Sequence, residues 1–237
     1  MTMTYRMENI AFNDSKKGIE SITEKAFNNN INPIIIDEIS ICNANYDEIE
    51  NMIKKAILVY NRKFTTQNEN SIHNEKITKV IDLYRQLYPY STYLLCKTAK
   101  GKIIGSLCTS IKKGPVSFPI EQDYKNHLST EYTEKSKPNI FYGSVTFIDK
   151  DYIEKSSLKK NLVINLWSQM LKMSAEMIIN YGDGVYLSHT EKSAYSVIKK
   201  VLGMPWEQIG NEISWLNSTI IPCMITTDGL KKWLNKK

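Results

Sequence analysis

Residues 139–180 combine residue types that can hold an anion between a strand and a helix. The segment opens with an apolar, β-branched and aromatic run at 140–148, which has the length and composition of a buried strand. A polar stretch at 149–155 follows, and Ser156 and Ser157 then open a long amphipathic helix. The first N–H groups of a helix lack intrahelical partners, and the helix dipole adds roughly half a positive charge there. This order of strand, polar turn and helix predicts an anion site at the two serines.

Three polar side chains near this segment are candidates for proton transfer or for lining a pocket. His189 ends a predicted strand, and an imidazole pKa near neutrality suits a proton acceptor. The alternative is a capping cluster in which Thr190 caps the next helix and His189 is a polar residue at a strand end. Tyr142 and Ser144 alternate along the central strand and should face one side, where they could line a pocket or form a satisfied core pair. The Met-rich side of the long helix is expected to be core, with an acyl-binding surface as the alternative: Met170, Met173 and Met177.

The cysteines and histidines show neither a disulfide framework nor a metal-binding pattern. No two of the four cysteines have CxxC spacing, and most lie in apolar, strand-like runs, which favours free thiols in a reducing cytosol. Cys108 lies in the middle of a predicted strand with no nearby histidine, so we expect a packed thiol and not a nucleophile. His73, His127 and His189 are scattered, so no metal site is expected.

Length and charge limit the function classes. The chain has 237 residues, with 31 basic and 25 acidic side chains and a formal net charge of +6. This charge is too small to indicate nucleic-acid binding, although it suits a small acidic partner if the lysines cluster. The polar N-terminus has no apolar signal-peptide core, and no window reaches the about 18 apolar residues of a membrane span. We therefore expect a cytoplasmic protein.

Periodicity predicts an α/β fold with a mixed sheet, in which three antiparallel strands lead into a strand–helix–strand unit. Asn45 is the expected N-cap of the first helix, and Ala-Lys-Gly at 99–101 is the expected tight turn of a hairpin. The expected elements in chain order are a strand at 33–42, helices at 46–64 and 75–88, strands at 92–98 and 102–111, a helix-like stretch at 122–128, the strand at 140–148, the helix from 156, a strand at 185–189, a helix at 191–202, strands at 212–216 and 220–226, and a helix at 230–235.

Four short segments resemble, in order and spacing, those of the GNAT acyltransferase superfamily. They are KIIG at 102–105, GPVSFPIE at 114–121, the strand at 140–148 with its following helix, and VLGM at 201–204. GPVSFPIE is similar to the LP-x-E segment of the family, and VLGM to the LGF that closes its penultimate helix. Within the superfamily, the nearest likeness is to the N-acyl amino acid synthases and the acyl-homoserine-lactone (autoinducer) synthases.

The resemblance covers about residues 33–230 and implies a particular sheet. It is a GNAT-like mixed, mostly antiparallel central sheet of about six to seven strands, flanked by helices, with a splayed central strand. The implied organisation is a polar N-terminal arm at 1–32 and an acyltransferase domain at 33–237.

The same resemblance implies where an acyl donor binds. The exposed backbone of the splayed strand pairs with the pantetheine arm of the donor, and the next helix N-terminus holds its phosphate. In this chain Val145, Thr146, Phe147 and Ile148 would face the pantetheine, and Lys155, Ser156, Ser157, Leu158 and Lys159 would form the phosphate end. Family members that use acyl carrier protein need a basic surface near the entrance to this donor site. Lys155, Lys159 and Lys160 would supply it, with Lys199 and Lys200 as second candidates, unless these lysines form only a solvated helix face.

Two departures from the family pattern bear on the chemistry. The common GNAT phosphate loop is rich in glycine, whereas 149–157 contains none, so the loop is less open. The homoserine-lactone synthases carry an E-x-S-R pattern on the central strand, whereas residues 142–145 read YGSV. The serine is present and the acid and arginine are missing, which argues against the specific lactone chemistry.

The resemblance implies an N-acyltransferase that moves a fatty acyl chain from acyl carrier protein or acyl-coenzyme A to the amine of a small acceptor. The first candidate for this acceptor is an amino acid, and its amine would attack the thioester directly. The donor substrate would be acyl-coenzyme A or acyl-phosphopantetheine, with no metal. Glu121, in GPVSFPIE, could hold the acceptor or be a first-turn helix acid. Two alternatives stay open: a non-catalytic protein of the same fold that binds acyl thioesters or lipids, and an N-acetyltransferase dependent on acetyl-coenzyme A.

Overall fold

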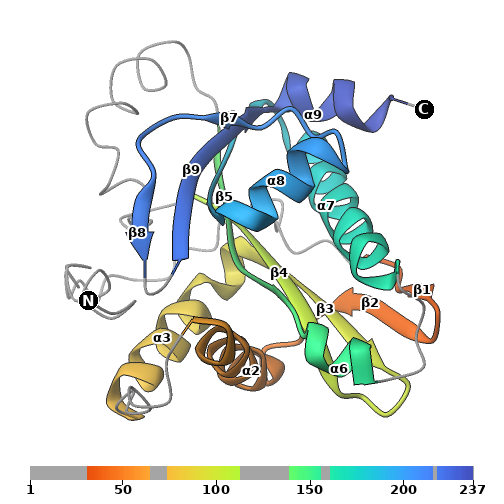
Figure 1. Cartoon of the computed structure of the whole chain (residues 1–237), viewed down its shortest axis with the longest axis vertical. Coiled ribbons are helices and arrows are strands. Elements are labelled where there is room, and N and C mark those ends of the chain that lie inside the picture. Colours follow the sequence, from red (N-terminus) through yellow and green to blue (C-terminus); the bar gives the residue numbers. More distant parts are fainter. Residues whose placement is uncertain (1–30, 65–73, 113–138, 156–160, 216–217, 237) are drawn as a thin grey trace, which may run out of the picture.

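A computed structural model describes residues 31–64, 74–112, 139–155, 161–215 and 218–236. They form one mixed sheet of nine strands in the order β1-β2-β3-β4-β5-β6-β9-β7, with β8 paired to β9 (Figure 1). β5 and β6 are parallel, and the other neighbouring pairs are antiparallel. The strands are β1 (Ile34–Ile36), β2 (Ile39–Asn43), β3 (Ser91–Thr98), β4 (Ile103–Ile111), β5 (Asn139–Ile148), β6 (Gly184–Glu191), β7 (Glu207–Gln208), β8 (Ile213–Trp215) and β9 (Ser218–Thr226). The helices are α2 (Glu48–Phe64), α3 (Asn74–Leu87), the 3₁₀ turn η1 (Tyr88–Tyr90), α6 (Lys150–Lys155), α7 (Leu162–Tyr181), α8 (Lys192–Lys200) and α9 (Thr227–Leu234).

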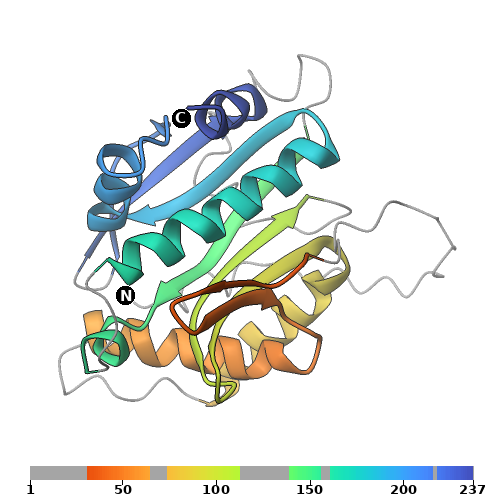
Figure 2. The same ribbon diagram turned by 90° about the vertical axis from the view of Figure 1, so that its right-hand side faces the viewer.

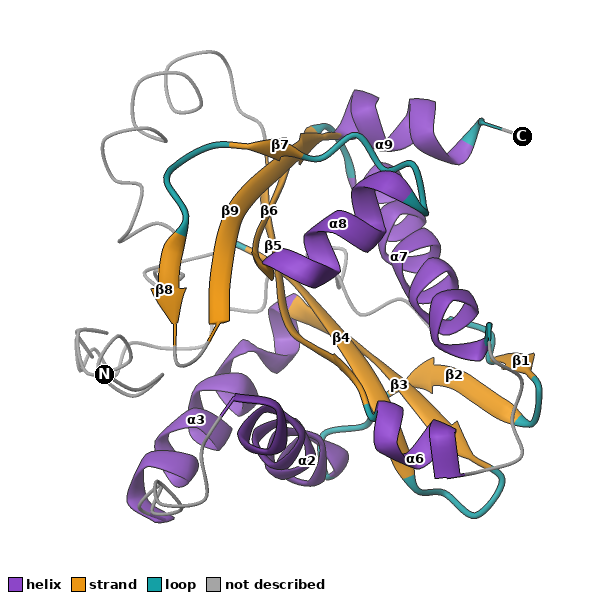
Figure 3. Cartoon of the chain, viewed as in Figure 1, coloured by secondary structure: helices purple, strands orange, loops and turns teal. Residues whose placement is uncertain are grey.

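Helices cover both faces of the sheet (Figure 3). α2 and α3 pack on one face, because α2 buries Ile49, Met52, Ile53 and Ala56 at three- and four-residue steps. The opposite face carries α7, α8 and α9, and Figure 2 looks directly onto α7. The Met-rich side of α7 is core, as expected: Met170, Met173 and Met177 are at most 5% exposed.

Local signals account for several boundaries. Asn45 caps α2 as expected: its Oδ1 accepts from the Glu48 N–H at 3.1 Å, and the Glu48 carboxylate accepts from the Asn45 N–H at 3.1 Å. This reciprocal pair is a capping box. The turn of the β3–β4 hairpin places Gly101 at φ +75°, where a side chain would be strained.

Three expectations about the elements were wrong. The single strand at 33–42 is a hairpin of β1 and β2, because Asp37 (φ 45°) and Glu38 (φ 67°) turn the chain between them. The sheet has nine strands and not six to seven, since the short β1 and β7 add to it. The polar stretch at 149–155 is not a loop but contains α6, and α7 begins at Leu162 and not at Ser156. Asp149 starts α6 by accepting a hydrogen bond from the Tyr152 N–H at 3.2 Å.

Two expectations lie outside the described residues. These are the helix-like stretch at 122–128 and nearly all of the polar arm at 1–32. Among the helices that the structure describes, none combines the length and apolar composition needed to cross a bilayer.

Candidate active site

The most distinctive feature of the sheet is the divergence of β5 from β6. The two strands pair only from Asn139 opposite Gly184 to Gly143 opposite Ser188. Beyond that point β6 keeps pairing with β9, and β5 keeps pairing with β4 as far as Ile148. The sheet therefore opens in a V, and the expectation of a splayed central strand is confirmed. Figure 2 shows the first turn of α7 at the open end of this V.

A β-bulge lies in β5 just past the apex of the V. Ser144 and Phe147 are opposite Cys108 and Ser106, so Val145 and Thr146 together face one residue of β4. Val145 has φ +46°, an uncommon conformation for a β-branched residue. Side chains hold both carbonyls of the bulge: the Ser106 hydroxyl donates to Val145 O at 2.5 Å, and the Tyr60 hydroxyl of α2 donates to Thr146 O at 2.6 Å. The bulge is thus fixed by its neighbours.

Gly143 allows a close contact at the apex. A Cβ on Gly143 would lie 2.3 Å from Tyr186 Oη and 2.8 Å from Tyr186 Cζ, so the ring of Tyr186 passes directly over the backbone of β5. Tyr186 is 2% exposed and packs in the core on the α7 side. The Ser188 hydroxyl donates to Gly143 O at 3.2 Å across the same junction. Only glycine fits where the two strands separate.

Tyr142 and Ser144 face α3, as their alternation predicted. The buried Ser144 hydroxyl lies beside the Tyr84 phenol and the Cys108 thiol, where it partly offsets the rise in pKa that burial causes in both groups. It makes no hydrogen bond of normal geometry with a described residue. His189 lies on β6 beyond the apex, and by strand alternation it shares the face of Val185 and Leu187, which pack toward α2 and α3. The structure therefore gathers three of the four predicted catalytic residues on one face of the V.

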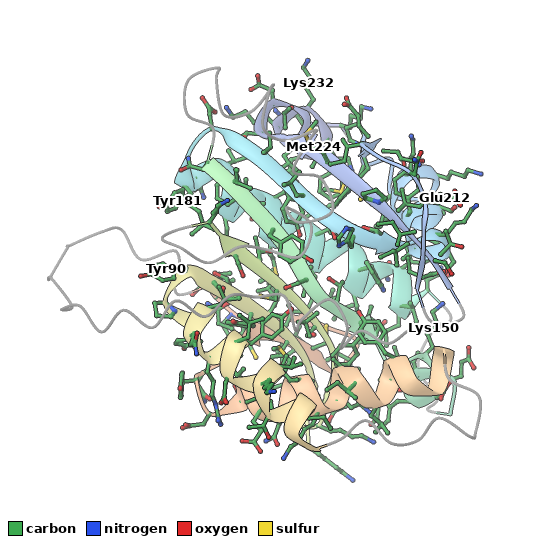
Figure 4. The ribbon with its side chains drawn as sticks, turned by 90° about the vertical axis from the view of Figure 1, so that its left-hand side faces the viewer. Tyr90, Lys150, Tyr181, Glu212, Met224 and Lys232 are labelled. Atoms are coloured by element: carbon green, nitrogen blue, oxygen red, sulfur yellow. The ribbon has the colours of Figure 1, made fainter. Side chains whose placement is uncertain are left out.

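The fourth predicted catalytic residue, Glu121, and most of the predicted phosphate end lie outside the described residues. Of the phosphate end, the structure describes the backbone of Lys155, the last residue of α6, but not Ser156, Ser157, Leu158 or Lys159. Lys160 also lies outside, whereas Lys199 and Lys200 are exposed in the last turn of α8. Figure 4 shows Lys150, the first residue of α6, and Glu212 on the same side of the molecule, with Tyr90 and Tyr181 on the other.

Two polar residues at the V were not predicted. Tyr60 lies in α2, and its hydroxyl reaches Thr146 O. Desolvation raises the pKa of the Tyr60 phenol well above its ordinary value, and the negative charge of Glu191 raises it further. Glu191, the last residue of β6, caps α8: its Oε2 accepts from the Ala194 N–H at 3.2 Å and from the Ser193 hydroxyl. The cap is therefore Glu191 and not Thr190, the residue to which the capping alternative gave this role.

The fold can be compared with solved structures. FeeM, an N-acyl amino acid synthase from uncultured soil microbes, superposes with a TM-score of 0.55 at 8% identity, over 85% of this chain and 96% of that one. The AHL synthase LasI superposes with a TM-score of 0.51 at 13% identity, over 80% and 89% of the two chains. This chain has a GNAT-like fold. No protein-family model and no curated protein sequence matches this chain. At such low sequence identity, the similarity to the solved structures shows the fold alone.

Within this GNAT-like fold, Cys108 is unsuited to nucleophilic attack. Its side chain is fully buried in β4, and burial raises the pKa of its thiol to about 11. A nucleophilic cysteine needs a thiolate near neutral pH, so Cys108 is a packing residue. Among the described residues, no group of three histidine, cysteine or acidic side chains could hold a metal ion.

A cavity of about 310 Å³ lies away from the V of the GNAT-like fold, between the end of β9 and α9. None of the polar residues described above lines it, and Asp228 and Lys232 at its rim belong to α9. We assign it no part in the chemistry.

Proposed function

We propose that this protein is an N-acyltransferase. It would move a fatty acyl chain from a thioester donor, acyl carrier protein or acyl-coenzyme A, to the amine of a small acceptor such as an amino acid. The observation that supports this most directly is the divergence of β5 from β6 beyond Gly143 and Ser188, while β5 stays paired with β4. An opened strand can pair through its backbone with an extended, amide-bearing ligand, and pantetheine is such a ligand.

The donor would lie along Val145, Thr146, Phe147 and Ile148. Phe147 is paired to Ser106 of β4 but has no ladder partner in β6, as this arrangement requires. A backbone N–H of the bulge would then donate to the thioester carbonyl as negative charge develops on its oxygen. The phosphate of the donor would rest before α7, at Ser156, Ser157 and Leu158, with Lys155 and Lys159 as counter-charges.

The acceptor would approach from the α2 and α3 face, opposite to α7. Tyr142, Ser144 and His189 share this face and would line the acceptor pocket, with Glu121 as a further acceptor contact. The amine attacks the thioester carbonyl directly, so the site needs a group to accept the amine proton and no covalent intermediate. His189 or a second group on this face would accept the proton.

The proteins with a similar fold and the exposed lysines bear on the nature of the donor. FeeM is an N-acyl amino acid synthase and LasI is an AHL synthase, and both proteins share this fold. Lys199 and Lys200 are exposed and would complement an acidic carrier protein. Acetyl-coenzyme A as donor is the alternative within the same reaction class. The free, mostly buried thiols suit a cytoplasmic location.

One observation favours a second function, the binding of acyl thioesters without turnover. The central strand reads Tyr142-Gly143-Ser144-Val145 and lacks the acid and arginine of the homoserine-lactone synthases. A protein that had lost its acid–base groups could still have the opened sheet and still bind an acyl thioester there.

We expect the purified chain to form N-acyl products when it is given acyl carrier protein or coenzyme A thioesters from acetyl to palmitoyl with a pool of amino acids. Mass spectrometry detects the product by its added acyl mass, and boiled protein is the control for spontaneous aminolysis. A long-chain preference supports the fatty acyl donor, and an acetyl preference supports the N-acetyltransferase. No product with any donor, together with a rise in melting temperature on adding the donor, would leave the binding function and contradict catalysis.

A further inference from the structure

The mouth of the V carries a carboxylate to which the sequence and the comparisons assign no chemical role. Glu191 ends β6 three residues beyond Ser188, where the pairing with β5 stops. Strand alternation places it on the same face as Leu187 and His189, which is the face of α2 and α3. Its side chain is partly exposed. Glu191 therefore lies on the acceptor side of the opening, in the arm of the V opposite to the bulge.

Tyr60 connects the two arms of the V. Its hydroxyl donates to Thr146 O of the bulge in β5, and the charge of Glu191 acts on the same phenol from β6. Glu191 on β6 and the bulge on β5 thus lie on the two arms of the same opening. The two cap contacts on Oε2 orient the carboxylate at the start of α8. A carboxylate has about four lone-pair sites, so one that accepts hydrogen bonds can also accept a proton.

We propose that Glu191 is the catalytic proton acceptor for the attacking amine and that Tyr60 is a positioning residue that holds the bulge beside it. This inference rests on the proposed acyltransfer and names the group that carries its proton step.

The step balances without a further reactant. The acceptor enters as an ammonium ion and gives one proton to the Glu191 carboxylate. The neutral amine attacks the thioester carbonyl carbon, so a C–N bond forms and the C–S bond breaks. The departing thiolate takes the second nitrogen proton and leaves as a thiol, and Glu191 returns its proton to solvent.

The titratable and charged groups that the structure places around Glu191 come from several elements. They are Tyr60 on α2, His189 on the same strand, Lys192 on α8, and Glu212 before β8, which pairs with Lys192 at 2.9 Å. An imidazole can also accept a proton from an amine, so the contribution of His189 has to be separated by substitution.

Glu191→Gln tests the proposal, because the glutamine oxygen can still accept the cap bonds of α8 but cannot act as a base. We expect kcat/KM to fall about 10²- to 10⁴-fold, the range of general-base catalysis, with little change in the KM for the donor. The acidic limb of the pH profile should disappear in Glu191→Gln and persist in His189→Gln. Tyr60→Phe should lower the rate and keep the acidic limb. Glu212→Gln is the matched control, an acid beside α8 whose loss should leave the rate unchanged.

Three results would overturn the assignment. A wild-type rate with an intact acidic limb in Glu191→Gln would show that the carboxylate only caps α8. A rate loss that follows a loss of melting temperature across Glu191→Gln and Glu191→Asp would show the same. If the wild-type chain acylates no amine, the proposed function fails as well, and this outcome is distinct from turnover that survives Glu191→Gln.

Discussion

Lys55→Met should lower the free energy of unfolding by about 3–5 kcal/mol, the usual effect of removing one partner of a buried ion pair. Lys55 of α2 pairs with Asp149 at the end of β5, and their side chains are only 15% and 4% exposed. Without Lys55, the Asp149 charge would stay in the interior and lose the cation that offsets it. Urea denaturation followed by circular dichroism gives the change in free energy.

A double substitution separates the charge from the packing. Asn at 149 can still accept the hydrogen bond from the Tyr152 N–H that starts α6, so Lys55→Met with Asp149→Asn should recover most of the lost stability. Lys54→Met is the control on the same helix. Lys54 pairs with Glu50 at 2.6 Å, with side chains 56% and 36% exposed, and its loss should cost at most about 0.5 kcal/mol. A Lys55→Met variant that unfolds like Lys54→Met would contradict this picture of the junction between β5 and α6.

Gly143→Ala should destabilise the apex of the V by about 2–3 kcal/mol, the range found for overpacking a core. The new Cβ would lie 2.3 Å from Tyr186 Oη, and Tyr186 is only 2% exposed. The backbone of β5 would have to shift away from Tyr186, which means away from β6 or toward α2 and α3. The same denaturation measurement reports the loss.

Tyr186→Leu tests whether the contact is the cause. The smaller side chain removes the atoms that clash, so the double variant should lose less stability than the sum of the single variants, by at least about 1 kcal/mol. Gly105→Ala in β4 is a matched glycine whose Cβ would meet nothing closer than Phe147 O at 3.1 Å. Its cost should be smaller than that of Gly143→Ala. Equal costs at both sites, with additive effects in the double variant, would remove the apex contact as the explanation.

The parts of the fold that depend on local signals were predictable. The capping box at Asn45, the turn at Gly101 and the apolar side of α7 follow from residues close in sequence, and the central strand is a continuous apolar run. The start of α6 is not evident from the sequence, although Asp149 is a normal N-cap, because the residues after it are polar and typical of a loop. The divergence of β5 was expected from the family resemblance and not from the composition of the strand.

The functional contacts that were missed join distant segments. Tyr60 and Thr146 are 86 residues apart, and nothing in the helical pattern of α2 distinguishes a tyrosine that reaches the sheet from one in the core. The sequence around Glu191 is typical of an acid at the start of a helix, and Glu191 does cap α8. Its position at the V follows only from the pairing of β6 with β9, which extends β6 to this residue. The residue with positive φ in the bulge is Val145 and not a glycine, so the sequence gives no sign of this conformation. Register and tertiary packing, and not propensity, decide these features.

Amide hydrogen exchange tests the opened sheet as a donor site most directly. A thioether analogue of an acyl-pantetheine thioester cannot be turned over, so its effect on exchange reports binding alone. We expect protection at residues 144–148 of β5 and at 189–191 of β6, with no change in β2 or β3. Unchanged exchange at 144–148 under saturating analogue, or protection confined to the cavity between β9 and α9, would contradict a donor lying along β5.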